Sequence, residues 1–407
     1  MQCKMRWTYL IAVLFVFALT LPASATSEPV KVSSSTQFLW GDDLTGDSQA
    51  TIAQYLRFSY NPEKKNFSAA GYGRFTKDIE SGTIRDNNFN VRLYYLYLDY
   101  SPIEQISMRL GRQYVNFSAG SSLMDGATIN VNKIGPLGVT VAAGRDIVYS
   151  LDSETSRPGN VFAGIDIHLQ DVKNTQLGIS YVRKYDQKDL SREEFGMNFR
   201  YIYKWMSPYA ELKYDRLSKA FDEATLGVDL FPIHNLSVKA EFYHSYPTFD
   251  STSIFSVFAV DKFREYLLSA EYSLPKAPVS VFGQYKRQTY EDDSNADVFA
   301  VGARFFPTDK LTLSASVDYR HSFEDKDWGF EITGDYKINK KFLVAAGVQH
   351  NAYQRPDDNG NRSAQRYWVG GKWQATQNMG VTARLEDNAN ESFSHRMLGR
   401  IALDWTL

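Results

Sequence analysis

Polar and apolar side chains alternate along the stretch Glu194–Arg216, and this alternation restricts the conformations that the stretch can adopt. In its first half every second residue is apolar or aromatic: Phe195, Met197, Phe199, Tyr201, Tyr203 and Trp205. Successive side chains of a β-strand point to opposite faces, so the pattern predicts a strand with one apolar and one polar face. Ser207-Pro208 then predicts a turn, because proline cannot donate a hydrogen bond to a sheet. The return segment, residues 209–215, alternates in the same way, so the whole stretch is predicted to form a β-hairpin.

The first 25 residues are predicted to be a cleaved signal peptide rather than part of the fold. Lys4 and Arg6 form a positive start, Tyr9–Leu21 is an apolar run, and Ala23-Ser24-Ala25 is a small-residue cleavage site. The apolar run is short for a membrane-spanning helix. We therefore expect residues 26–407 to form the mature protein, a single domain.

The composition excludes several classes of protein. The only cysteine, Cys3, lies in the signal peptide, so the mature chain has no disulfide, no thiolate metal site and no haem-attachment motif. Removing Lys4 and Arg6 changes the net charge from −2 to −2 − 2 = −4, which argues against binding to nucleic acid. The mean hydropathy of −0.38 fits a soluble protein, but it also fits a membrane barrel, in which only alternate residues face lipid.

Short and long connections alternate between the predicted strands. Short turns are expected at sites such as Ser207-Pro208, Phe231-Pro232 and Pro307–Lys310, and longer polar connections are expected at sites such as Asp146–Asn160, Asp186–Glu193, Pro247–Asp261 and Gln354–Ser363. Such sorting is typical of a membrane barrel, with short periplasmic turns and longer extracellular loops. The segments between the breaks predict an all-β, antiparallel, up-and-down transmembrane β-barrel of about 22 strands, within a range of 16 to 22.

The last strand alternates to the end of the chain, with Ile401, Leu403, Trp405 and Leu407 on one face. This ending resembles that of bacterial outer-membrane proteins, which prefer an aromatic final residue where this chain has Leu407. The resemblance implies a location in the outer membrane of a Gram-negative bacterium, in contact with membrane lipid and lipopolysaccharide.

Charged residues in the middle of strands are expected to face the lumen, because a charge at the centre of the bilayer costs about 2–4 kcal/mol. The predicted lumen-lining residues are Arg57, Arg74, Arg109, Arg200, Lys204, Glu211, Lys213, Lys239, Glu241, Lys286, Arg304, Asp318, Glu331, Asp335 and Arg384. Basic residues occur near the N-terminal part of the wall, and acidic residues gather at Asp318–Asp335. Two interpretations are open: charges that pair across neighbouring strands, and a transverse field that orients a solute or a partner.

One segment resembles the strand-and-loop pattern of bacterial porin-like barrels. It comprises Leu110-Gly111-Arg112-Gln113, then Phe117-Ser118-Ala119-Gly120, then Met124-Asp125-Gly126. Gly111 is expected to mark a bulge that turns Arg112 away from lipid. The segment is expected to be either a loop at the outer rim or a constriction loop.

No catalytic or metal site is visible in the sequence. The six histidines show no metal-ligand spacing, and no histidine is placed with a serine and an acid as a catalytic group requires. We expect the protein not to be an enzyme and to bind no cofactor of its own.

Two functions are consistent with the predicted barrel. The first is a porin-like channel across the outer membrane. The second follows from the width of a 22-strand barrel, which is usually filled by a plug domain, whereas only a few residues precede the first strand here. In this respect the chain resembles the barrels of porin–cytochrome conduits. That resemblance implies multihaem cytochromes as partners, with haem present only in the partner.

Overall fold

The computed structural model describes residues 30–42, 46–62, 66–80, 89–149, 154–246, 262–292, 294–322, 326–355 and 358–406. The predicted signal peptide, residues 1–25, and the predicted connection Pro247–Asp261 lie outside these residues. Within them, no helix is both long enough and apolar enough to cross a membrane.

The described chain forms one antiparallel sheet of 22 strands, as the sequence predicted. Its first half consists of β1 (Val30–Asp42), β2 (Ser48–Tyr60), β3 (Phe67–Glu80), β4 (Phe89–Ile103), β5 (Ile106–Phe117), β6 (Gly120–Ile134), β7 (Leu137–Asp146), β8 (Val161–Leu169), β9 (Thr175–Asp186), β10 (Asp189–Tyr201) and β11 (Met206–Asp215). Its second half consists of β12 (Ala220–Ile233), β13 (Leu236–Ser245), β14 (Phe263–Ser273), β15 (Val279–Thr289), β16 (Asn295–Thr308), β17 (Leu311–His321), β18 (Lys326–Asn339), β19 (Phe342–Arg355), β20 (Asp358–Gln374), β21 (Met379–Ala389) and β22 (Arg396–Thr406).

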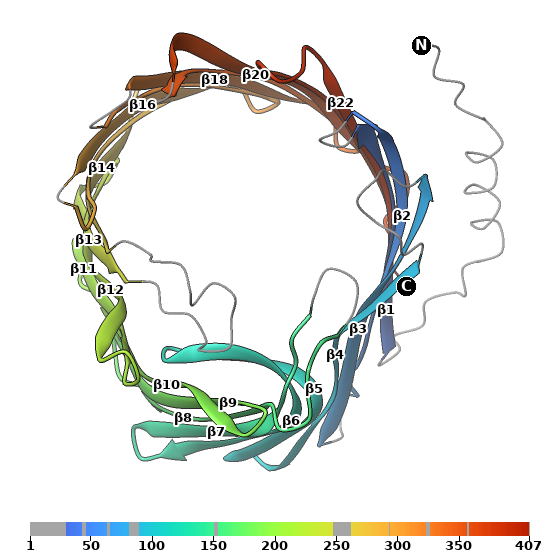
Figure 1. The fold of residues 1–407 in the computed structure, drawn as a ribbon, viewed down its shortest axis with the longest axis vertical. Coiled ribbons are helices and arrows are strands. Elements are labelled where there is room, and N and C mark those ends of the chain that lie inside the picture. Colours follow the sequence, from blue (N-terminus) through green and yellow to red (C-terminus); the bar gives the residue numbers. More distant parts are fainter. Residues whose placement is uncertain are drawn as a thin grey trace.

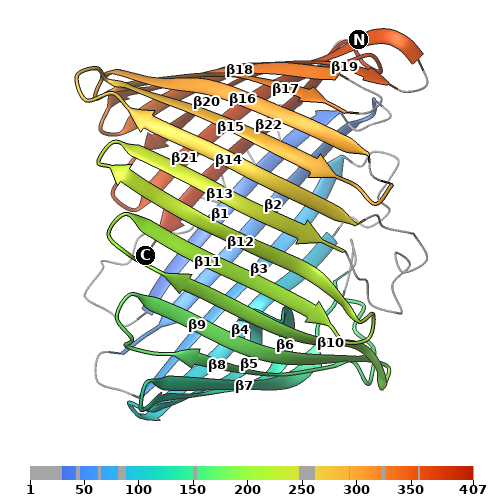
Figure 2. The ribbon, with the colours of Figure 1, turned by 90° about the vertical axis from the view of Figure 1, so that its left-hand side faces the viewer.

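The sheet closes into a barrel. Each strand pairs with the strand before it in the sequence, and β1 pairs with both β2 and β22, for example through Ser35, which lies opposite Tyr55 on one side and Asp404 on the other. Figure 1 shows the resulting ring, and Figure 2 shows the strands inclined to its axis. Closure leaves no free sheet edge, which is what a β-structure needs in order to span a lipid bilayer.

The two ends of the barrel differ in their connections. At one end the connections run from two residues, as at 104–105, to six residues, at 61–66. The two longest connections, 147–160 and 246–262, are both at the other end. We call these the short-turn end and the long-loop end, and they correspond to the periplasmic and outer sides.

Three predicted turns lie inside strand ends instead. Ser207-Pro208 belongs to β11, Phe231-Pro232 to β12 and Pro307 to β16, and the turns themselves are 202–205, 234–235 and 309–310. Proline is tolerated at these places because the ladder is ending there: β10 pairs with β11 only from Tyr209 onward, so Pro208 has one neighbour fewer.

Two predicted long connections are also wrong. Gln187 and Lys188 form a two-residue turn with positive φ values of 51° and 81°, and β19 and β20 extend through most of the predicted loop Gln354–Ser363. These segments were predicted as loops because they are polar. A strand that extends beyond the membrane has no apolar face to maintain, so its sequence resembles that of a loop.

Candidate functional site

The hairpin made by the end of β5 and the start of β6 leaves the barrel wall and lies inside the ring. Pairing between β4 and β5 stops at Leu96 and Arg112, and pairing between β6 and β7 stops at Met124 and Asp146. Residues 114–117 and 120–123 pair only with each other. We call residues 113–123 the inner hairpin, and Figure 1 shows it inside the lumen, beside β7 to β10.

The departure from the wall begins at Gly111. Its φ is +122°, a value that other residues rarely adopt, and a Cβ there would overlap the carbonyl oxygen of Leu96. The register of β5 continues unbroken through Gly111 on both sides, so the predicted bulge is absent. Gly111 instead allows β5 to bend towards the lumen.

Apolar packing holds the inner hairpin against the wall. Its Val115, Phe117 and Ala119 form one buried cluster with residues at its base and on β7, β8 and β9, namely Met124, Ala142, Phe162 and Val182. The ring centroids of Phe117 and Phe162 are 6.4 Å apart. Among the described residues this is the main apolar core of the molecule, because the remaining interior of the barrel is lined largely by polar side chains.

The tip of the inner hairpin contacts the wall through backbone and small side chains. The amide of Ala119 donates to Ser180 Oγ at 2.7 Å, and the hydroxyls of Ser118 and Ser180 are 2.8 Å apart. A Cβ at Gly196 would overlap the backbone of Ser118 and Ala119, so glycine is what permits this close approach.

A buried group of charges lies below the tip. Glu194, only 1% exposed, accepts from Arg192 at 3.0 Å and lies 3.4 Å from Lys213, which also contacts Asp222 at 2.8 Å. A buried charge needs such partners, because a lone carboxylate would lose its hydration without compensation. The hairpin tip packs directly against this cluster, since a Cβ at Gly120 would lie only 2.9 Å from Glu194 Oε2.

The inward turn leaves a gap in the wall between β4 and β7, and the connection after β7 fills it. Tyr149 donates to the carbonyl oxygen of Leu93 at 2.6 Å and accepts from Arg112 at 2.7 Å. Burial raises the pKa of the Tyr149 phenol, which favours its neutral, hydrogen-bond-donating form. Arg112 also pairs with Asp125 at 2.7 Å and with Glu154 at 3.0 Å. Arg112 is therefore neutralised by these partners rather than turned away by a bulge.

The inner hairpin identifies which residues face the lumen. Gly196 contacts the hairpin, so its row of β10 faces inward, and directly opposite residues of neighbouring strands share a face. Following the register from strand to strand returns to the same row after a full turn of the ring. Fourteen of the fifteen predicted lumen residues lie in this inward row: Arg57, Arg74, Arg109, Arg200, Glu211, Lys213, Lys239, Glu241, Lys286, Arg304, Asp318, Glu331, Asp335 and Arg384. The exception is Lys204, which lies in the turn 202–205 between β10 and β11 and was wrongly placed in a strand because the aromatic alternation continues through that turn.

Most lumen charges on β10 to β16 form ion pairs, three of them between strands and one, Lys239–Glu241, along β13. The pairs are Arg200–Asp229 at 3.2 Å, Lys239–Glu241 at 2.8 Å, Lys286–Glu265 at 3.0 Å and Arg304–Glu271 at 2.8 Å. In this part of the wall the lumen charges therefore neutralise one another, which agrees with the interpretation of paired charges rather than with that of a transverse field. On β2, β3, β17 and the C-terminal part of β18 the pattern differs, since no ion pair within the described residues involves Arg57, Arg74, Asp318 or Asp335.

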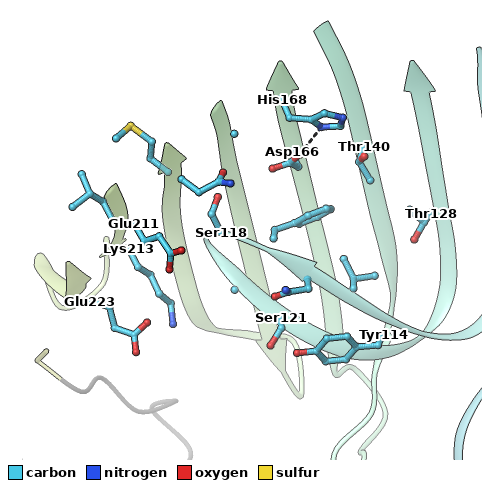
Figure 3. A pocket seen from close by; sticks show the side chains of 18 of the residues that line it. Tyr114, Ser118, Ser121, Thr128, Thr140, Asp166, His168, Glu211, Lys213 and Glu223 are labelled. Carbon is cyan, nitrogen blue, oxygen red and sulfur yellow. Dashed lines mark hydrogen bonds and ion pairs between the residues drawn. The ribbon is translucent and has the colours of Figure 1, made fainter. Parts of the chain in front are cut away.

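A cavity of about 810 Å³ lies between the inner hairpin and the wall. Figure 3 shows its two sides, with Glu211, Lys213 and Glu223 on one side and the hydrogen-bonded pair Asp166–His168 on the other. Tyr114, Ser118 and Ser121 of the inner hairpin complete the lining. His168 Nδ1 is 2.8 Å from Asp166, and within the described residues no group of three or more metal-binding side chains is present. The cavity is a polar, water-accessible space suited to contact with a passing solute.

The sequence indicated the inner hairpin but not its docking site. Phe117–Gly120 lies within the porin-like segment, for which an outer-rim loop and a constriction loop were both open, and the structure shows the inward position. Ser180, Gly196 and Glu194, which receive the hairpin, carry no signal of their own, because they lie about 60 to 80 residues further along ordinary strands.

Comparisons with known proteins support the fold. No protein-family model and no curated protein matches this chain. Among solved structures, the siderophore receptor PirA from Pseudomonas aeruginosa matches 95% of this chain and 82% of its own, with a TM-score of 0.64 and 10% identity. The translocation pore of the P pilus usher PapC matches 93% and 99%, with a TM-score of 0.52 and 9% identity. OccAB2 from Acinetobacter baumannii matches 93% and 97%, with a TM-score of 0.51 and 11% identity. At these identities the likeness shows the fold, which is that of outer-membrane β-barrels.

Proposed function

We propose that this protein is a channel in the outer membrane of a Gram-negative bacterium, and that it allows small polar solutes to diffuse through its lumen. The observation that carries the proposal is the inner hairpin, which docks inside a closed barrel and forms a polar cavity with the wall. A barrel of 16 to 18 strands already encloses water, so one of 22 strands needs a narrowing element if it is to select among solutes. The inner hairpin is such an element, and it is built from the wall strands themselves.

The lining supports passage rather than catalysis. Lumen charges on β10 to β16 are neutralised in pairs, which leaves a hydrated surface with little net attraction for a single ion type along that part of the wall. The neighbours named above also include a translocation pore and a siderophore receptor. We propose that the protein acts without a cofactor and without chemical conversion of the solute.

The second hypothesis, a barrel of a porin–cytochrome conduit, has no comparable support. None of the three solved structures named above is described as a cytochrome conduit. The hypothesis was based on the absence of a plug domain in a wide barrel, and the inner hairpin lies inside the barrel without such a domain. Multihaem cytochromes therefore remain only a prediction from the sequence.

Reconstitution of the purified protein alone tests the proposal. We expect a haem-free preparation to give stable single-channel conductance in planar bilayers and to admit small neutral sugars into liposomes, because the lumen needs no partner. Migration that changes on heating, as folded barrels show, serves as the control for folding. A folded preparation that neither conducts nor admits sugars, or that is always accompanied by haem protein, would contradict the proposal.

A further inference from the structure

Five tyrosines form a continuous row on the lumen face of β2, β3 and β4. Neighbouring rings lie 6.2 Å apart for Tyr55–Tyr72, 4.9 Å for Tyr72–Tyr94, 5.7 Å for Tyr72–Tyr95 and 5.5 Å for Tyr95–Tyr97, with interplanar angles between 21° and 42°. The row ends beside Arg109, whose guanidinium lies 3.9 Å from the centroid of the Tyr97 ring. Arg109 also lines the cavity below the inner hairpin, so the tyrosine row leads to that cavity.

The arginines beside this row differ from the other lumen cations. Arg109 pairs with Asp99 at 2.7 Å, but no carboxylate among the described residues pairs with Arg57 or Arg74. Arg57 is exposed to the lumen and lies over the Tyr72 ring, with 4.8 Å between its Cζ and the ring centroid. Arg74 lies opposite Tyr55 in the register of β2 and β3, so two positive charges lie beside the tyrosine row without an acid to balance them.

Arg74 is the more unusual of the two. Its Nε is shielded from solvent and has no hydrogen-bond partner, and the hydroxyl of Thr76, two residues further along the same face, is in the same state. Arg74 also lies directly opposite Arg92 in the register of β3 and β4, which places two like charges on neighbouring strands. Buried polar groups are nearly always satisfied, and leaving them without partners costs free energy. The arrangement suits an anion that lies against the face of β3.

The row also limits the shape of that anion. The rings extend over three strands, further than one small ring can reach, and each ring carries a phenol hydroxyl. A chain of pyranose rings fits such a surface, because its C–H faces pack on aromatic rings and its hydroxyls bond to phenols. A carboxylate on such a ring can pair in bidentate fashion with a guanidinium.

We propose that the lumen face of β2 to β4 is a binding site for acidic oligosaccharides, with Arg57 and Arg74 pairing with sugar carboxylates and Tyr55, Tyr72 and Tyr95 supporting the sugar rings. The proposal depends on the channel function proposed above and specifies a solute class for it. Binding along the row would concentrate such solutes at the entrance to the cavity that Arg109 lines.

Single-channel recording with defined probes tests this site. We expect trigalacturonate to interrupt the current of the wild-type channel, whereas maltotriose, neutral and of the same ring number, and benzoate, at equal carboxylate concentration, should not. Arg74→Gln should weaken trigalacturonate block about tenfold or more, as loss of a charge-assisted pair predicts. Tyr72→Leu should shorten the interruptions while leaving the lumen charge unchanged.

Matched variants distinguish the site from a general effect of charge. Lys286→Gln removes one lumen cation on β15, away from the tyrosine row, and should leave the block unchanged. Arg57→Gln, at an exposed position, provides a second test if Arg74→Gln fails to assemble. Equal block by benzoate or maltotriose, or block that survives Arg57→Gln, Arg74→Gln and Tyr72→Leu, would overturn the assignment. A wild-type channel that conducts without being blocked overturns this inference alone, whereas a protein without conductance contradicts the channel function itself.

Discussion

Removing the inner hairpin is expected to raise the single-channel conductance about twofold or more, because a 22-strand barrel without it encloses a wider aqueous path. The change can be made with little strain. Tyr114 lies opposite Leu123, so replacing Val115–Ser122 with Asn-Gly joins them through the two-residue turn that hairpins prefer. The deletion removes three of the seven residues of the apolar cluster, so some loss of stability is expected as well, and heat-dependent migration on gels should confirm that the barrel still assembles.

A single substitution tests the same element without shortening the chain. Gly196→Val places a side chain where the backbone of Ser118 and Ala119 lies, so it should displace the hairpin tip and raise conductance in the same direction. Gly283→Val, in the outward row of β15, is the control for adding a valine to the sheet, because the nearest atom to a Cβ there is 3.7 Å away. Conductance that is unchanged in both the deletion and Gly196→Val would show that the inner hairpin does not restrict the lumen.

Val228→Arg is expected to reduce the yield of assembled barrel severely. Val228 lies near the middle of β12 in the outward row, opposite Pro208 and Ala240, and a charge at the bilayer centre costs about 2–4 kcal/mol. The measurement is the fraction of protein in outer membranes that shows heat-modifiable migration. Nearly all of the Val228→Arg protein should be unassembled or degraded.

The control for Val228→Arg must lie on the other face of the same strand. Thr225 lines the cavity, so Thr225→Arg should assemble at close to the wild-type level while altering conductance. Alternation alone suggests Gly227→Asp as an equal control, but a Cβ at Gly227 would overlap the Tyr209 ring, so that variant would be damaging for a different reason. Equal loss in Val228→Arg and Thr225→Arg would mean that the faces have been assigned wrongly.

The strands of the barrel wall could be predicted from sequence because the polarity pattern of each strand depends only on its own position between lipid and water. A strand between lipid and water must alternate, so the row of Leu226, Val228 and Leu230 indicated the outward face, and charges such as Arg200 and Glu241 indicated the inward one. The prediction failed in two kinds of place: where residues alternate although they are not in a strand, and where a strand lies outside the bilayer and need not alternate. Aromatic residues alternate through the turn that holds Lys204, whereas the polar strand ends beside the turn 187–188 and at 354–355 and 358–363 have no lipid to face.

The inner hairpin could be located only in part, because its position depends on contacts distant in sequence. Gln113 to Phe117 mixes polar and apolar residues, and nothing in those residues indicates that they leave the sheet. The positive φ of Gly111 and the space above Gly196 decide the bend and the docking, and both depend on the backbone of other strands. The lumen arginines were predicted individually. Only the structure shows that most cations on β10 to β16 are paired with acids, whereas Arg57 and Arg74 are not.

Cross-linking of the hairpin tip to the wall is the most direct test that a narrowing element lies inside this barrel. The hydroxyls of Ser118 and Ser180 are 2.8 Å apart, and the only native cysteine is Cys3, in the predicted signal peptide. The double variant Ser118→Cys, Ser180→Cys should form a disulfide in the assembled protein after mild oxidation, visible as a reducible shift on gels, because an S–S bond of about 2.05 Å is within reach. The pair Ser118→Cys, Ser316→Cys, with Ser316 on the inward row of β17, should not form one. Free thiols at both Ser118 and Ser180 positions in assembled, oxidised protein would contradict the account.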